Sequence, residues 1–289
     1  MKSIIIIVKN DRKIENLLSK LKDISKPADT EIIVIDSSRG LLDDIKEKFN
    51  FVKWIYYENT SNKKITIPEQ RNEGVKNAKG DIIVFIDADC TPDKNWINNL
   101  IKPIIKDKES IVAGKVIFSD SNSIFTSDTD SRNHMKYVDD GPTMNIAIKK
   151  EVFNDLGLFD PNFSIGEDVD FCWRARKRGY KIRLINDAII YHDLGSFKND
   201  IRRMYYYGIA RIKLYKKHTY RIKYLLEESL KILFTFYFLL LPITIIYPLY
   251  PLIGILLFIK NSEKTLQGKF KIIFLKAVYG LGMLVGIFS

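Results

Sequence analysis

The sequence contains only two cysteines, Cys90 and Cys172, among its 289 residues. Two isolated thiols cannot form the disulfide framework of a small secreted protein, and we expect neither a disulfide nor a metal role for them. The chain also lacks an amino-terminal apolar run of signal-peptide length, because the run at 4–8 is soon followed by Asp11. No internal repeat is visible, which argues against a repeat array. These absences favour an amino-terminal part that stays in the reducing cytoplasm.

Charge is absent from one long part of the chain. Residues 232–259 carry no charged side chain, and residues 270–289 carry only two, both lysines. Uncharged runs of this length are typical of membrane segments. Lysines flank the first run on both sides, so a hairpin at about 230–259, turning at Tyr247–Pro251, competes with one long tilted helix. The segment 270–289 could cross once more, and buried helices of a soluble domain are the remaining alternative.

Positive charge is concentrated just before this uncharged run. The net charge is +11, and residues 198–223 contain nine Lys or Arg against a single acid, Asp200, interleaved with five tyrosines. Basic and aromatic residues together also occur in nucleic-acid binding. Apolar residues at helical spacing and the adjacent uncharged run instead favour an amphipathic helix on an anionic leaflet. We therefore predict a membrane-surface helix over 198–223 and no nucleic-acid partner.

Strands and helices alternate through the first part of the chain. Apolar runs predict strands, and a helical period predicts helices between them, so that the expected order is strand 4–8, helix 13–24, strand 31–36, helix 41–49, strand 52–57, helix 69–78 and strand 82–86. This alternation indicates an α/β fold with a doubly wound, mostly parallel sheet of Rossmann-like type. Further on we expect strands at 111–118, 144–148, 181–185 and 188–191, helices at 95–105, 150–156 and 167–178, and a polar lid at 125–140.

Two aspartates, Asp87 and Asp89, follow the strand at 82–86. Because residues i and i+2 of a strand point the same way, we expect their carboxylates side by side at the carboxyl edge of the sheet, where open α/β folds bind ligands. Two hard oxygen ligands there suit Mg²⁺ or Mn²⁺ holding a diphosphate. Capping of a helix or turn is the alternative. The same Asp-x-Asp pattern recurs at 128–130 in a polar loop and at 168–170, so the pattern alone is not diagnostic.

The helix expected at 167–178 begins with two acids, Glu167 and Asp168. The free N–H groups and the dipole of a helix amino terminus keep a carboxylate there ionised. An ionised carboxylate beside a bound sugar is a candidate general base for an acceptor hydroxyl. Ordinary capping of the helix by acids explains this motif equally well.

Taken in order, seven short motifs resemble those of the inverting family 2 glycosyltransferases of GT-A fold. They are Val34-Ile35-Asp36-Ser37-Ser38, Arg71-Asn72-Glu73-Gly74, Asp87-Ala88-Asp89, Asn145-Ile146-Ala147-Ile148, Gly157-Leu158-Phe159-Asp160, Gly166-Glu167-Asp168 and His192. The resemblance covers roughly residues 1–215, and the ordered set is specific although each motif alone is weak.

The resemblance implies a donor side and a metal. The aspartate matching Asp36 holds the nucleobase or ribose, and the stretch containing Arg71 lies by the nucleotide. The residues matching Asp87 and Asp89 bind the nucleotide and a divalent metal, Mg²⁺ or Mn²⁺. His192 resembles a histidine that approaches the metal or diphosphate, which makes Asp89 and His192 the expected metal ligands. A lone histidine is otherwise often a structural hydrogen-bond donor.

The resemblance also implies an acceptor side. The residue matching Asp168 is the catalytic base, and we expect Glu167, Asn145 and Trp173 on the acceptor side or in supporting positions. The Gln-x-x-Arg-Trp motif of processive synthases is missing, so we expect transfer of one sugar per encounter. Asp36 is followed by Ser-Ser-Arg-Gly where many members carry further acids, which leaves the base of the donor open.

We therefore expect a metal-dependent inverting glycosyltransferase on the cytoplasmic side of the cell membrane. Its catalytic domain would span residues 1–222 and its membrane-embedded helical tail residues 224–289. The donor would be a nucleotide sugar, the acceptor a lipid-linked or cell-surface glycan, and membrane lipids would be further partners. The rivals are a polyprenyl-phosphate sugar synthase and a catalytically silent membrane scaffold of the same fold.

Overall fold

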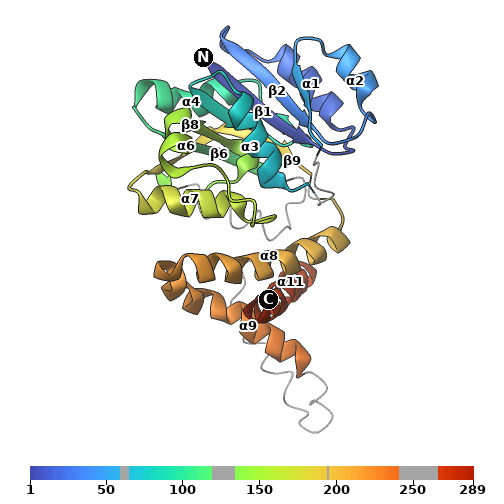
Figure 1. The fold of residues 1–289 in the computed structure, drawn as a ribbon. Helices are drawn as coiled ribbons and strands as arrows, with labels where there is room; N and C mark the ends of the chain where they lie inside the picture. Colours follow the sequence, from blue (N-terminus) through green and yellow to red (C-terminus); the bar gives the residue numbers. More distant parts are fainter. Residues whose placement is uncertain (59–64, 119–133, 194, 241–265) are drawn as a thin grey trace. The chain divides into compact units, whose positions relative to one another are not determined.

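The computed structural model describes residues 1–58, 65–118, 134–193, 195–240 and 266–289 (Figure 1). The chain divides into two compact units, one formed by Met1–Ser119 with Asp128–Asp193 and one by Asp120–Ser127 with Leu194–Ser289. Most of the lid expected at 125–140, the Asp-x-Asp triplet at 128–130 and the turn of the expected hairpin lie outside the described residues. The expected boundary at 222–224 stays a prediction.

The first unit is built on one sheet, whose first half is parallel. Strands β1 (Lys2–Val8), β2 (Thr30–Asp36), β3 (Lys53–Tyr56) and β4 (Ile82–Phe85) lie in the order β3-β2-β1-β4, and each neighbouring pair is parallel. These are the four strands that apolar runs predict. The carboxyl ends of parallel strands meet at one edge of a sheet, so β2 and β4 deliver Asp36 and the Asp87–Asp89 segment to the same edge.

The second half of the sheet is mixed. It continues from β4 through β8 (Ile146–Lys149), β6 (Ile111–Phe118), β9 (Ile182–His192) and β5 (Cys90–Pro92), and β7 (Tyr137–Val138) also pairs with β9. Strand β8 is antiparallel to both β4 and β6, whereas β6 and β9 are parallel. The expectation of a mostly parallel sheet therefore holds for the first four strands only.

One predicted break in the sheet is absent. The segments 181–185 and 188–191, which the sequence predicts as two strands, form the single strand β9, which continues through polar Asn186 and Asp187. A register shift opposite Gly114 and Lys115 of β6 accommodates the extra residues. Gly114 is required there, because a Cβ atom at this position would lie 2.4 Å from the carbonyl oxygen of Ala188.

Helices cover both faces of the sheet. Helices α1 (Ile14–Asp23), α2 (Asp43–Lys48) and α4 (Trp96–Lys106) pack in one core cluster with Ile4, Ile6 and Val8 of β1. Helices α3 (Ile67–Asn77), α6 (Lys150–Leu156) and α7 (Glu167–Lys177) pack in another cluster with Ile5. Because successive side chains of a strand point to opposite faces, the continuous isoleucine run of β1 serves both cores.

Helix α3 begins two residues before the expected Glu69. The Thr66 side chain accepts a hydrogen bond from the Glu69 N–H (3.4 Å), and the Glu69 carboxylate accepts one from the Thr66 N–H (2.8 Å). This reciprocal capping box satisfies two of the free N–H groups of the first turn. It fixes the start of the helix that carries buried Arg71 and Asn72 toward the interior.

The second unit is helical. It contains α8 (Phe197–Lys217), a 3-10 segment (Thr219–Tyr224), α9 (Leu225–Leu239) and α11 (Leu266–Phe288), and α11 packs against both α8 and α9 (Figure 1). The amphipathic helix expected at 198–223 is thus α8 followed by a tighter turn. Within the described residues, one helical stretch, Phe270–Phe288, has the length and apolar composition needed to cross a bilayer.

Candidate active site

A buried arginine joins three segments at the edge of the sheet. Arg71 of α3 directs Nη2 to the carboxylate of Asp87 (3.0 Å), which lies just after β4. Its Nη1 donates to the carboxylate of Glu167, the first residue of α7. Two carboxylates brought together by folding therefore share one guanidinium, whose fork geometry suits such a bridge. Because both of these nitrogens are engaged, the side chain of Arg71 positions Asp87 and Glu167 in this structure.

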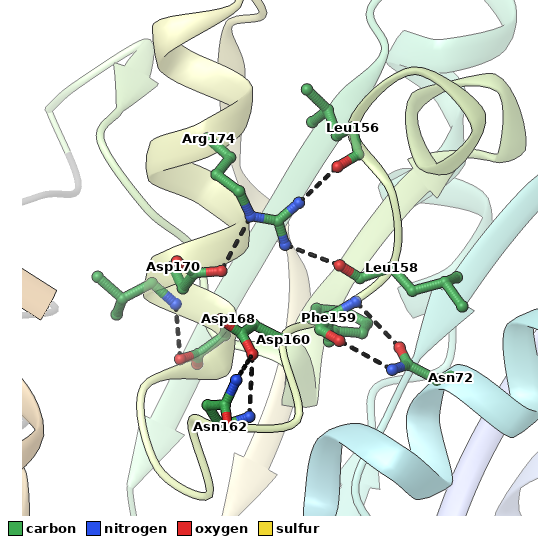
Figure 2. Close-up of polar contacts among 10 residues, drawn as sticks. Asn72, Leu156, Leu158, Phe159, Asp160, Asn162, Asp168, Asp170 and Arg174 are labelled. Carbon is green, nitrogen blue, oxygen red and sulfur yellow. Dashed lines mark hydrogen bonds and ion pairs between the residues drawn. The ribbon is translucent and has the colours of Figure 1, made fainter. Parts of the chain in front are cut away.

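Asp168 lies next to this bridge. It is half-buried, and its carboxylate accepts a hydrogen bond from the Val169 N–H (2.8 Å) (Figure 2). Burial raises the pKa of Asp168 above its ordinary value, against the attraction of Arg71, and it raises the pKa of Glu167 to about 7. Desolvation by burial therefore opposes the ionising effect expected from the helix terminus at both carboxylates. A raised pKa makes Asp168 a stronger proton acceptor.

The two aspartates after β4 contact different partners. The strand ends at Phe85, and a turn follows in which the Cys90 N–H donates to the Asp87 carbonyl oxygen (3.1 Å). Asp87 contacts Arg71, whereas Asp89 contacts His192 (3.2 Å from Nε2). Strand alternation therefore does not orient these carboxylates, contrary to the argument made from the sequence.

Asp89 and His192 belong to a cluster able to hold a metal ion. The register of β5 on β9 sets Cys90 opposite His192, and one ligand atom from each of Asp89, Cys90 and His192 lies within 4.8 Å of the others. The Nδ1 atom of His192 is buried and has no partner in the described part of the chain. A carboxylate with an imidazole fits a divalent ion such as Mn²⁺ or Mg²⁺.

The sequence predicts no metal role for Cys90, because the two cysteines are isolated from each other. Its place in the cluster depends on the three-residue strand β5, which is too short to show a periodic pattern. Burial raises the pKa of the thiol, so it stays protonated near neutral pH. Mg²⁺ and Mn²⁺ prefer oxygen and imidazole ligands to sulfur, so Asp89 and His192 are the ligands that the donor chemistry favours.

Asp36 lines a pocket of about 260 Å³. Its carboxylate accepts the Ser38 N–H (2.8 Å), which closes a tight turn after β2. The other lining residues are Gly40, Asp43, Lys46, Trp54 and Tyr56. A carboxylate acceptor among aromatic side chains suits a flat base with N–H donors. Sequence reasoning missed the aromatic pair, although Trp54 and Tyr56 are two residues apart on β3, with Tyr56 level with Asp36 on β2.

Asn145 and Trp173 both lie in the interior. The Asn145 side chain accepts from Trp96 Nε1 (2.8 Å) and donates to the carbonyl oxygens of Lys115 and Ala188 (2.9 Å each). These bonds tie the turn just before β8 to α4, β6 and β9. For Asn145 the arrangement favours the supporting alternative, since its side chain is fully buried and fully engaged.

The loop before α7 is held by Arg174 of that helix (Figure 2). Arg174 Nε donates to the buried carboxylate of Asp170 (2.9 Å), and its two Nη atoms donate to the carbonyl oxygens of Leu156 and Leu158 (2.8 Å each). Gly157 between them has φ +78°, a conformation that favours glycine. We call Arg174 with these partners the loop clamp.

Helix α3 holds the same loop from its other side. The Asn72 side chain donates to the carbonyl oxygen of Phe159 (2.8 Å) and accepts from its N–H (3.0 Å) (Figure 2). Arg71 and Asn72, adjacent on α3, therefore hold Glu167 and the loop leading to it. The base candidate Asp168 is placed by both.

Loss of the loop clamp should lower the transfer rate without weakening donor binding. We expect Arg174→Gln to reduce kcat about 10- to 100-fold, since small displacements of a catalytic group carry costs of this order. The donor KM should change little. Steady-state kinetics with Arg178→Gln as control test this, because Arg178 is an exposed arginine at the carboxyl end of the same helix, where its side chain pairs with Asp155. Equal losses in both variants, or a change in KM alone, would contradict a positioning role.

The fold and the site together define a glycosyltransferase of GT-A type. The profile of glycosyl transferase family 2 matches residues 3–180, and the chain belongs to this family. It is therefore an enzyme of the glycosyltransferase class.

Named relatives and solved structures agree with this assignment. Glycosyltransferase AglE of Haloferax volcanii is 25% identical over 74% of this chain and 73% of its own length. A dolichyl N-acetyl-alpha-D-glucosaminyl phosphate 3-beta-D-2,3-diacetamido-2,3-dideoxy-beta-D-glucuronosyltransferase of Methanococcus voltae is 29% identical over 74% of this chain and 71% of its own. The mannosyltransferase PcManGT of Pyrobaculum calidifontis, solved with GDP-Man and Mn²⁺, matches with a TM-score of 0.60 at 16% identity over 99% of this chain and 73% of that one. The chain spans only 34% of two other curated relatives and 38% of another solved chain.

Proposed function

We propose that this glycosyltransferase moves one sugar from a nucleotide-sugar donor to a lipid-linked or cell-surface glycan acceptor, with inversion at the anomeric carbon. The observation that carries the proposal is the placement of Asp168 beside the Asp87–Arg71–Glu167 bridge. That bridge couples the segment expected to bind the donor with the helix expected to carry the base.

The proposed reaction is a single displacement. Asp168 accepts the proton of the acceptor hydroxyl while the hydroxyl oxygen attacks the anomeric carbon and the bond to the nucleoside diphosphate breaks. The raised pKa of Asp168 supports this role, because the carboxylate gains driving force for proton transfer. Asp89 and His192 would hold a divalent ion, whose charge would stabilise the departing diphosphate. Asp36 and the aromatic pocket beside it would take the base of the donor.

The acceptor class rests on the relatives and on the chain's own helices. The Methanococcus voltae relative is named for a dolichyl-phosphate-linked sugar, and a second Haloferax volcanii relative is a glucosyl-dolichyl phosphate glucuronosyltransferase. The basic helix α8 and the apolar helix α11 support attachment to the cytoplasmic face of a membrane, where such acceptors are held. The test is to offer the enzyme a polyprenyl-phosphate sugar or bare polyprenyl phosphate and to measure the mass of the products. The proposal predicts that the polyprenyl-phosphate sugar gains the mass of one sugar. A gain of mass by bare polyprenyl phosphate alone would favour a polyprenyl-phosphate sugar synthase.

Metal binding should depend on His192. We expect a chelator to abolish transfer and Mn²⁺ to restore it, and we expect His192→Ala to weaken Mn²⁺ binding by about tenfold or more because one of two proposed ligands is lost. Titration calorimetry of Mn²⁺ binding gives a readout independent of activity. His134→Ala is the control, since His134 is an exposed histidine outside the cluster. Unchanged Mn²⁺ affinity in His192→Ala would remove His192 from the ligand set.

A further inference from the structure

Helices α8 and α11 run in the same direction and are in contact near their starts, midway and near their ends. Near their starts, Asp200 approaches Lys271 (4.0 Å) and the rings of Phe197 and Phe274 lie 6.2 Å apart. Near their ends, Lys216 donates to the carbonyl oxygens of Gly286 and Ile287 (3.0 and 3.1 Å). The partners follow the same order on both helices, which only parallel neighbours can do.

Glycines bring the two backbones into contact midway. A Cβ atom on Gly208 would lie 2.1 Å from the carbonyl oxygen of Tyr279, and one on Gly282 would lie 2.0 Å from that of Tyr205. Arg211 Nε also donates to the Tyr279 hydroxyl (3.1 Å). Such close approach is possible only for glycine, and it joins the two backbones midway between the contacts near the helix ends. Because the two helices are in contact near both ends and midway, α8 cannot lie outside the bilayer while α11 crosses it.

The composition of α8 decides how the pair lies in the membrane. Its sequence carries seven Lys or Arg, and its longest uncharged stretch, 204–210, has only seven residues. Seven helical residues cover about 10 Å, a third of the roughly 30 Å hydrocarbon core. A pair standing across the bilayer would therefore place several cations of α8 within the core, at about 2.5–3.5 kcal/mol for each near its centre. A pair lying in the membrane plane leaves them all at the headgroups.

The remaining surface of this unit fits the in-plane arrangement. Among the exposed apolar side chains, Leu233 and Phe236 of α9 form one stripe with Leu240 just after that helix, and Leu281, Val285 and Phe288 of α11 form another. Their spacings of three, four and seven residues place each set on one helix face. Exposed Lys198, Lys213 and Lys217 of α8 and the exposed tyrosines Tyr206 and Tyr207 suit anionic headgroups.

We propose that α8, α9 and α11 form a monotopic anchor in which α11 lies in the plane of an anionic phospholipid leaflet and does not cross the bilayer. The inference rests on the membrane attachment in the proposed function and specifies its geometry. It replaces the possible extra crossing at 270–289 with an interfacial helix, although α11 is long and apolar enough to span.

Single cysteines at the helix ends distinguish the two geometries. Ser196→Cys, Thr219→Cys and Ser289→Cys change exposed residues before α8, after α8 and after α11, and the native Cys90 and Cys172 are buried. In sealed inside-out membrane vesicles, a membrane-impermeant maleimide should label all three variants, and in intact cells it should label none. The unchanged chain is the control for background labelling.

Every other pattern overturns the inference in an identifiable way. Labelling of the Ser289 variant from the face opposite to the other two means that α11 crosses alone. Opposite labelling of the Ser196 variant against the Thr219 and Ser289 variants means that the pair crosses together. Recovery of the chain in the soluble fraction would show that it does not attach to membranes, which contradicts the in-plane anchor. Sugar transfer to a soluble acceptor, measured on the same fraction, tests the proposed activity separately.

Depth quenching gives a second readout. Phe270, Leu281 and Phe288 are exposed residues on one stripe of α11, and the native tryptophans all lie in the first unit. In vesicles with brominated lipids, Phe270→Trp, Leu281→Trp and Phe288→Trp should be quenched at the same depth. Quenching that is deepest for the Leu281 variant and shallow for the other two would instead indicate a spanning helix.

Discussion

Asp168→Asn should lower kcat for sugar transfer by about 10²- to 10⁴-fold, the contribution expected of a general base. Asparagine keeps the shape of the side chain but cannot accept the hydroxyl proton. Donor binding should stay nearly intact, because the residues expected to hold the nucleotide, Asp36 and Asp87, come from other segments. Transfer rates together with nucleotide affinity from calorimetry test this. An equal loss of transfer and of nucleotide binding would argue against the base role.

The pH profile of the same variant gives a more specific test. Asp168 can accept a proton only when it is ionised, so the wild-type kcat should fall as the pH falls through its pKa. Burial raises that pKa above the ordinary aspartate value of 3.8, so the acid limb should lie at correspondingly higher pH. Asp168→Asn should lack the limb, whereas Asp155→Asn, a change at an exposed carboxylate paired with Arg178, should keep both rate and limb.

Arg71→Met should destabilise the first unit by about 3–5 kcal/mol, because it leaves the buried carboxylate of Glu167 and the half-buried carboxylate of Asp87 without their cation. The measurement is urea unfolding of the detergent-solubilised chain by tryptophan fluorescence. All three tryptophans, Trp54, Trp96 and Trp173, lie in this unit, so the signal reports it selectively. A loss below about 1 kcal/mol would mean that water screens the bridge.

Two comparisons separate lost charge pairing from lost packing in Arg71→Met. Adding Glu167→Gln should recover part of the stability, because it removes one unpaired charge. The deficit of Arg71→Met should also be larger at about pH 8 than at about pH 5, since a protonated Glu167 needs no cation. The sign follows from the pKa of Glu167, which burial raises from 4.5 to about 7, so the folded state holds this proton more tightly than the unfolded chain.

Local patterns predicted much of the fold. The strands β1 to β4, β6 and the helices between them lie within a few residues of the expected ranges, and α6 matches its range. Periodicity is a property of neighbouring residues, so it survives without knowledge of the tertiary structure. The sequence predicts two strands where β9 is one, because the register shift on β6 that accommodates polar Asn186 and Asp187 within a single strand is a nonlocal feature.

The sequence predicts which residues belong to the candidate site, but it does not predict the contacts between them. Motif order singled out Arg71, Asp87, Glu167 and Asp168, yet nothing local indicates that Arg71 bridges Asp87 and Glu167, residues that are 16 and 96 positions away. The direction of the pKa shifts was also missed, because burial of a helix terminus depends on what packs over it. The sequence predicts no role for Arg174, whose guanidinium donates hydrogen bonds to the carbonyl oxygens of Leu156 and Leu158.

The amino-acid sequence by itself determined the α/β class, the acidic motifs and the apolar, basic-flanked tail, because composition and spacing express backbone preference and hydrophobicity directly. Only the tertiary structure decided which carboxylates share Arg71, that Cys90 lies by His192, and that α8 and α11 run side by side in one direction. Those facts depend on contacts between distant segments, and contacts of that kind set both the proton affinity of Asp168 and the tilt available to α11.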